Sequence, residues 1–292
     1  MRWVQYMGLD LLDVGRPLDL MDIMTGLRLC EINGNNSGLR GFKMSGGITD
    51  SPVVLFNACY STDKGEGLAA MAEAYDKHLK ESGLYAGLGF DPEGNEACSP
   101  LEALLADKVD QRFLHPPTVT PWATFEPESI AALLEETNAT HFVVKPRNGI
   151  QGNFIRIVPR ACLYEVVDPS VIIEPLLVPK GRFARALRTG VAVIRNGARL
   201  DVCHLASYWR VSRCPFDPGN PGSVIVNLSL GALPVALSSR DEFEAITTWM
   251  QHWCSHLRAT LPGIEQLYFW SNFNEICPDV DPLWIRSRIS LL

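Results

Sequence analysis

The feature that most constrains the fold is a series of closely spaced strand patterns in the second half of the chain. Each pattern is an apolar run bounded by glycine, proline or asparagine, which are typical turn residues. The expected strands cover 141–145, the end of a glycine-rich stretch at 149–158, 171–177, and a hairpin at 187–204 that turns at Asn196-Gly197. Helical patterns flank this series at 127–137, which begins with Pro127, and at about 241–259. This mixture of strands, hairpins and helices indicates α+β or α/β lobes.

Composition narrows the class of protein further. The chain has 292 residues, 47% of them hydrophobic, and a net charge of −7. This apolar content excludes a disordered or collagen-like chain, and the acidic balance argues against a nucleic-acid partner. No apolar run reaches the ~18 residues of a membrane span, no signal sequence is recognisable, and the eight cysteines lack paired metal-site spacing. We therefore expect a soluble, cytoplasmic protein with reduced thiols and no membrane partner.

The first group of candidate functional residues runs from Phe142 to Asn153. A buried strand ends at Lys145, and a loop containing Gly149, Gln151 and Gly152 follows it. A lysine at this position can hold a phosphate oxygen, while the backbone N–H groups of the loop close over the other phosphates. A lysine that is merely solvated at the end of a strand is the alternative.

The second group lies between residues 16 and 33. If 16–21 and 27–33 form a hairpin, Glu31 and Asn33 share one face of their strand, and Asp19 comes close from the partner strand. Cys30 and Ile32 then form the opposite, apolar face. Carboxylate and amide oxygens are ligands suited to Mg²⁺ that bridges nucleotide phosphates. A solvated polar face is the alternative.

The third group begins in the strand at 171–177. Extended backbone from Glu174 through Leu176 to Leu177 can present N–H and C=O groups to a base. Downstream, Arg188 and Arg210 can bind carboxylate or phosphate oxygens. Each of these signals is weak when it is taken alone.

Together the three groups resemble the ATP-grasp superfamily of carboxylate–amine ligases. In most members the metal-binding Asp and Glu-x-Asn strands follow the lysine and the glycine loop, whereas here they precede them. This order resembles the circular permutation of eukaryotic-type glutathione synthetases. The resemblance implies an α+β ATP-grasp fold in which two α+β subdomains clasp ATP, accompanied by a small α/β lobe.

The resemblance also implies roles for individual residues. Lys108 and Lys145 would contact phosphates, Gly149, Gln151 and Gly152 would belong to the covering loop, and Glu174, Leu176 and Leu177 would hold adenine. Asp19, Glu31 and Asn33 would bind Mg²⁺. Arg188, Arg210 and Asn227 would act in catalysis near the metal, since Asn227 begins a stretch similar to the Asn-x-x-x-Gly-Gly of many members. Substrate contacts are expected from Arg16, Asn35 and Ser37.

The sequence also departs from the glutathione synthetases. Gly149 stands where the synthetases have a metal-binding glutamate, and Asn148 or Gln151 could supply the missing oxygen ligand. Ala232 stands where the second glycine of the Asn-x-x-x-Gly-Gly motif is expected. We expect a metal-binding hairpin at 1–50, an α/β lobe at 51–105, a nucleotide-binding subdomain at 106–178, and a second subdomain with a C-terminal helix at 179–292.

The expected activity is ATP-dependent amide or peptide bond formation through an acyl phosphate, with ATP and Mg²⁺ as cofactors. The expected partners are a small carboxylate and an amine, such as amino acids or short peptides, and a homodimer is left open. Two alternatives remain: a nucleotide-binding protein that retains the fold without ligation, and a phosphotransferase on the same fold.

Overall fold

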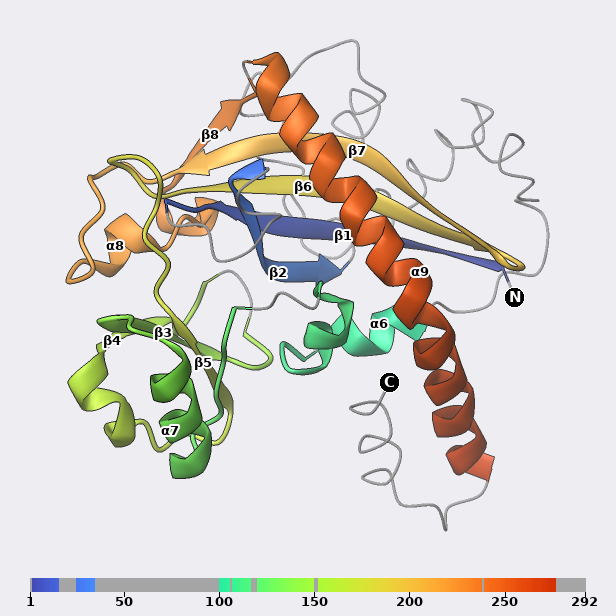
Figure 1. Cartoon of the computed structure of the whole chain (residues 1–292), viewed down its shortest axis with the longest axis horizontal. Helices are drawn as coiled ribbons and strands as arrows, with labels where there is room; N and C mark the ends of the chain where they lie inside the picture. Colours follow the sequence, from blue (N-terminus) through green and yellow to red (C-terminus); the bar gives the residue numbers. More distant parts are fainter. Residues whose placement is uncertain are drawn as a thin grey trace.

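The structure is a computed structural model that places two antiparallel sheets beside each other (Figure 1). Most of the second half of the chain is described, together with shorter pieces of the first half. The described residues are 2–15, 25–34, 100–105, 107–116, 120–149, 152–237 and 239–276. The mixture of helices and antiparallel strands agrees with the predicted α+β class.

The larger sheet has five strands in the order β2-β1-β6-β7-β8, all antiparallel to their neighbours. These strands are β1 (Arg2–Asp13), β2 (Leu27–Gly34), β6 (Arg185–Asn196), β7 (Arg199–Val211) and β8 (Leu233–Ala236). One long helix, α9 (Arg240–Ile276), crosses one face of this sheet (Figure 1). The hairpin predicted to turn at Asn196-Gly197 is confirmed as β6–β7, and Gly197 has the positive φ of 59° that such a turn favours.

The smaller sheet has three antiparallel strands in the order β4-β3-β5. Its strands are β3 (His141–Pro146), β4 (Arg156–Pro159) and β5 (Val171–Pro175), and α7 (Pro127–Glu136) packs against it. The predicted helix with Pro127 in its first turn and the three predicted strands of this region are therefore confirmed.

Short helices complete the two layers. They are α6 (Pro100–Leu105), η1 (Asp110–Leu114), η2 (Arg160–Glu165), α8 (Pro221–Val224) and η3 (Leu228–Leu230). Leu101 of α6 and Leu114 of η1 are fully buried in the core of the larger sheet. The expected lobe at 51–105 lies outside the described residues except for α6 at its C-terminal end.

Each sheet has its own hydrophobic core on the face that its helix covers. Against α9, the larger sheet buries Met7, Leu9 and Leu11 of β1, which alternate along the strand. Against α7, the smaller sheet buries Phe142 and Val144 of β3. The residues between these positions lie on the opposite faces of the two sheets. Several of them line a pocket.

Among the residues that the structure describes, no helix is long and apolar enough to cross a membrane. The longest, α9, is amphipathic instead. Its apolar residues recur every three or four positions, as a helix that covers a sheet requires. They are Ile246, Trp249, Met250, Trp253, Leu257 and Leu261.

Candidate functional site

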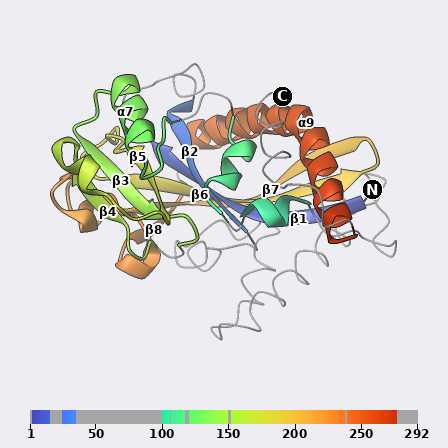
Figure 2. The same ribbon diagram turned by 90° about the horizontal axis from the view of Figure 1, so that it is seen from below.

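A pocket lies where the two sheets meet, and it is lined from both of them. From the smaller sheet it takes the residues that alternate with the α7 core, including Val143, Lys145 and Glu174. From the larger sheet it takes residues on the face away from α9, including Asp10 and Arg210. In Figures 1 and 2 the smaller sheet stands next to one end of the larger one, which agrees with this arrangement. The predicted site residues that line the pocket are Glu31, Lys145, Gly152, Glu174, Leu176, Leu177, Arg210 and Asn227.

A β-bulge in β2 brings acidic residues to the pocket. Asp10 pairs with Glu31 across the sheet, but the next residue of β1, Leu11, pairs with Leu29, so Cys30 has no partner on β1. Such a bulge re-aims the side chains that follow it. Leu29 before the bulge and Ile32 after it both face the α9 core, and Glu31 is left on the pocket face.

The bulge changes the expected face of Cys30, and the pairing of β2 with β1 shows which carboxylate faces Glu31. Cys30 was expected on the apolar face with Ile32, but it lines the pocket beside Glu31. The segment 16–21 and Asp19 lie outside the described residues. Within the described part, the partner of β2 is β1, and the carboxylate facing Glu31 is that of Asp10.

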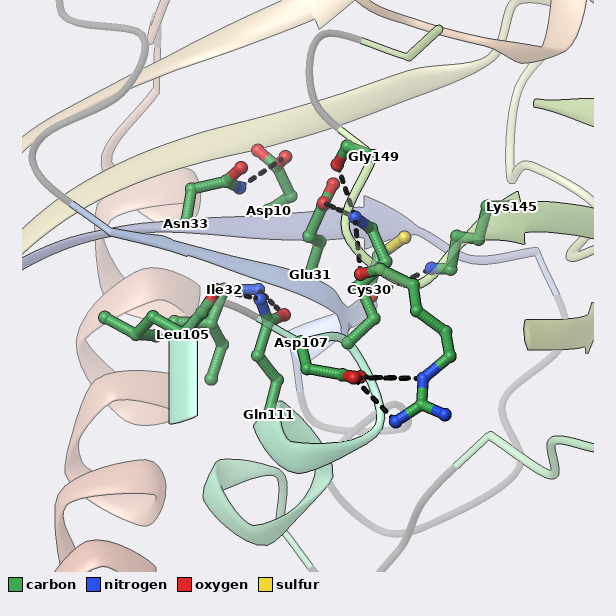
Figure 3. A network of polar contacts seen from close by, with 12 residues as sticks. Asp10, Cys30, Glu31, Ile32, Asn33, Leu105, Asp107, Gln111, Lys145 and Gly149 are labelled. Carbon is green, nitrogen blue, oxygen red and sulfur yellow. Dashed lines mark hydrogen bonds and ion pairs between the residues drawn. The ribbon is translucent and has the colours of Figure 1, made fainter. Parts of the chain in front are cut away.

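Asp10 is the centre of a buried charge cluster. Arg188 donates from Nε and Nη2 to the two Asp10 carboxylate oxygens at 2.6 and 2.8 Å, and Arg210 Nη2 lies 2.5 Å from Asp10 Oδ1. Asn33 donates from Nδ2 to Asp10 Oδ2 at 3.3 Å (Figure 3). Burial alone would raise the pKa of Asp10, but the two guanidinium charges outweigh it and hold the pKa below its ordinary value. The two predicted catalytic arginines are thus brought together on one carboxylate.

The two predicted phosphate-binding lysines converge on β2. Lys108 Nζ lies 3.3 Å from Glu31 Oε1 and donates to the carbonyl of Gly149 at 2.5 Å. Lys145 Nζ donates to the carbonyl of Cys30 at 3.4 Å (Figure 3). Both ammonium groups are buried, and burial lowers the pKa of Lys145.

The segment with Lys108 is attached directly to the end of β3. Asp107 accepts hydrogen bonds from Arg147 Nε at 3.0 Å and from Arg147 Nη2 at 2.6 Å. The N–H of Lys108 donates to the Arg147 carbonyl at 3.1 Å. These contacts explain why two lysines 37 positions apart (145 − 108) reach the same place.

The side chain of Glu174 is engaged within the site. It accepts from Lys145 Nζ at 2.5 Å and forms an ion pair with Arg112. Its backbone belongs to the ladder between β5 and β3, where it pairs with Val143. The N–H of Leu176 donates to the His141 carbonyl, so that amide is already used by the protein.

The backbone polar groups of β5 alternate in direction, and the carbonyl of Pro175 is directed away from β3. Ile173 bonds to Ala123 on the side of the strand away from β3. Since successive residues of a strand direct their polar groups to opposite sides, the carbonyl of Pro175 also points away from β3. Pro175 and Leu177 both line the pocket, so the expected adenine contact shifts from Leu176 to its neighbours.

The glycine loop approaches the second sheet through Gly152. Its φ of 75° is in the left-handed region, and a Cβ placed there would lie 3.1 Å from Leu230 and 3.4 Å from Asn227. Asn227 begins a tight turn, because its carbonyl accepts from the N–H groups of Leu230 and Ala232 at 3.0 and 3.1 Å. Gly152 therefore permits the close approach that brings the loop to Asn227.

Several predicted site residues lie outside the described part of the chain. They are Arg16, Asp19, Asn35, Ser37 and Gln151. Two residues that sequence reasoning missed belong to the site instead, namely Asp10 and Arg112. For Asp10 the sequence did carry a signal, since an aspartate between Leu9 and Leu11 in an apolar strand requires a partner when buried.

The described residues near the pocket include oxygen donors but no complete metal site. In the described residues no group of three His, Cys, Asp or Glu side chains forms a metal cluster. Asp10, Glu31 and Asn33 nevertheless place hard oxygen donors on one face of β1 and β2. Such a partial set suits Mg²⁺, which commonly completes its shell with substrate phosphates and water.

Comparisons with known proteins gave no match: no family model, no curated protein and no solved structure matches this chain. Function is therefore inferred from the residues around the pocket and from the order of the motifs. The relevant features are the two lysines, the acidic face of β2 and the paired arginines.

Proposed function

We propose that this chain is an ATP-dependent carboxylate–amine ligase of the ATP-grasp type. The observation that carries the proposal is the pocket between the two sheets, which gathers Lys145, Glu31, Arg210 and Asn227 from four separate segments. All four residues belong to the motifs in which the sequence resembles the ATP-grasp superfamily.

In the proposed reaction, a substrate carboxylate attacks the γ-phosphoryl group of ATP. The acyl phosphate that forms is attacked by an amine, which displaces inorganic phosphate and leaves an amide and ADP. Little covalent chemistry is required of the protein, which acts by positioning the reactants and compensating charge. Lys108 and Lys145 supply two positive charges within the closed site.

The paired arginines fit the part of the reaction that involves the substrate carboxylate. Arg188 and Arg210 lie on the same face of β6 and β7 as Asp10, and their planar guanidinium groups suit carboxylate or phosphate oxygens. In the proposal they bind the carboxylate and then the acyl phosphate. Because water would hydrolyse that intermediate, the close approach of Gly152 to the Asn227 turn would help to keep water away from it.

Magnesium would be held by Glu31 and Asn33 together with phosphate oxygens, because both oxygens of Asp10 already accept from Arg188, Arg210 and Asn33. When bound, the ion would neutralise charge on the transferring phosphoryl group. Asp19, the carboxylate expected from the sequence, lies outside the described residues, and within the described part Asp10 faces Glu31. Glu31 in turn keeps Lys108 directed at the same place, through the 3.3 Å ion pair.

The test combines binding with turnover. Thermal unfolding is measured with and without MgATP, and ADP release is then measured with and without a pool of amino acids and short peptides. The proposal predicts a higher Tm with MgATP and ADP release that depends on the pool. A higher Tm without any ADP release would favour the alternative of a nucleotide-binding protein, which the glycine at position 149 also favours.

We also propose a cytoplasmic location. Cys30, Cys162, Cys214 and Cys254 are free thiols, as expected for a reducing compartment. Cell fractionation with a tagged protein tests this proposal.

A further inference from the structure

Arg112 is a buried arginine next to the pocket with no role in the reaction as proposed above. It lies in η1, between the segment that carries Lys108 and the smaller sheet. Its side chain is 9% exposed, forms an ion pair with Glu174, and lies over the ring of Trp122 at 5.8 Å. Burial lowers the pKa of Arg112 to about 10, so the guanidinium is still charged at neutral pH.

Glu174 stands between two cations. One carboxylate oxygen faces Arg112 and the other lies 2.5 Å from Lys145 Nζ. All three side chains are less than a tenth exposed. The trio therefore carries one negative and two positive charges in a site that excludes most water.

This arrangement lowers the free energy needed to move the Lys145 ammonium from Glu174 to a ligand. If Lys145 moves its ammonium from Glu174 to a phosphate oxygen, Glu174 still has Arg112 as a partner. Without Arg112 the same movement would leave a buried carboxylate with no compensating charge, which is strongly unfavourable.

We propose that Arg112 is a positioning residue, which holds the charge of Glu174 so that Lys145 can bind the phosphates of the nucleotide. The inference rests on the proposed function, since it takes a nucleoside triphosphate as the ligand. Arg112 itself contacts Glu174 rather than the ligand. Its contribution should therefore depend on the phosphates and leave binding of the adenosine moiety unchanged.

The experiment compares the affinities of MgATP and adenosine by isothermal titration calorimetry for the full chain and its variants. Arg112→Gln should weaken MgATP binding roughly tenfold or more and leave the affinity for adenosine within about threefold. Arg160→Gln is the matched control, because Arg160 is a structural arginine of η2 that donates to the carbonyls of Leu134 and Thr137 at 2.7 Å. It should not change the ratio of the two affinities.

Two further variants keep the test decisive if Arg112→Gln does not fold. Arg112→Lys retains the charge and should bind MgATP within about threefold of the wild type. The double variant Arg112→Gln, Glu174→Gln removes the carboxylate together with its partner. Its affinity for MgATP should be close to that of the wild type, a comparison that does not need the single variant, as expected for two residues that act through one interaction.

The outcomes separate this inference from the proposed function. If the wild-type protein binds no MgATP, both are overturned. If the wild type binds MgATP but Arg112→Gln keeps the wild-type ratio of affinities, or if the double variant is as weak as the single one, the role of Arg112 alone is overturned.

Discussion

Asp10 and Glu31 face each other across the β1–β2 pair, and the bulge at Cys30 keeps Glu31 on the pocket face. Asp10 also binds both buried arginines, Arg188 and Arg210. One strand pair thus supplies the acidic side of the pocket and fixes its arginines.

Replacing Asp10 with asparagine should destabilise the fold as well as abolish turnover. Arg188 and Arg210 would remain buried without a compensating charge, and breaking a buried ion pair costs about 3–5 kcal/mol. Asp13→Asn on the same strand is the control: its partner Arg185 is 37% exposed and also faces Glu242 at 3.8 Å, so Arg185 would keep water and a carboxylate as partners and we expect a smaller loss. Urea unfolding of both variants measures the difference, and equal losses would show that the cluster around Asp10 is not specially stabilising.

Lys145→Met should abolish phosphate release and leave the protein folded. The methionine keeps an apolar stem of similar length, and Glu174 keeps its ion pair with Arg112. Lys180→Met, at an exposed position, serves as the control and should retain wild-type release. The rate of phosphate release is measured beside the circular dichroism spectrum, and a folded Lys145→Met protein with normal release would remove Lys145 from the mechanism.

Gly152→Ala should cost more stability than Gly197→Ala, although both glycines have positive φ. The left-handed backbone costs about 1–2 kcal/mol at each position, but only at Gly152 would the new Cβ also meet neighbouring atoms, the nearest being 3.1 Å away on Leu230. At Gly197 nothing lies within 4 Å. Unfolding free energies test this difference, and Gly152→Ala should in addition raise the KM for ATP. Equal costs at the two positions would mean that the loop does not lie against the Asn227 turn.

His115 should make the protein less stable at mildly acidic pH. Its ring is buried, and burial, followed by the charges of Arg112, Lys145 and His256, lowers its pKa well below 6.5. The unfolded chain therefore takes up a proton that the folded chain refuses. Stability is fully present above about pH 6.5 and falls by about 1.4 kcal/mol per pH unit below it, until the folded-state pKa is reached.

Comparison of the wild type with His115→Gln between pH 7.5 and pH 5 checks this pH dependence. The variant should lose the part of the slope that His115 contributes, whereas His252→Gln, at an exposed position of α9, should not. Parallel curves for the wild type and His115→Gln would contradict the assignment.

Local patterns in the sequence predicted much of the fold. Pro127 and the apolar residues after it marked α7, and Asn196-Gly197 marked the β6–β7 hairpin, because both signals act over a few residues. The partner of β2 could not be predicted in this way. Pairing with β1 depends on a bulge at Cys30, and a one-residue bulge changes which side chains share a face without leaving a clear pattern.

Of the site, only the residues that belong to short motifs could be predicted. Lys145 and Glu31 belong to short motifs, and both line the pocket. Arg112 was missed because its ion pair with Glu174 joins segments far apart in the chain, and no local spacing reports such a contact. Asp10 was missed because it was not recognised as part of a strand.

The most direct test of ligase activity follows the oxygen atoms of the substrate carboxylate. The protein is incubated with MgATP and a mixture of amino acids and short peptides whose carboxylates carry oxygen-18, and the products are analysed by mass spectrometry. Formation of an acyl phosphate predicts a new amide, ADP, and inorganic phosphate that carries one labelled oxygen from the carboxylate. ADP release with unlabelled phosphate and no amide would contradict the account, because ATP would then be hydrolysed by water.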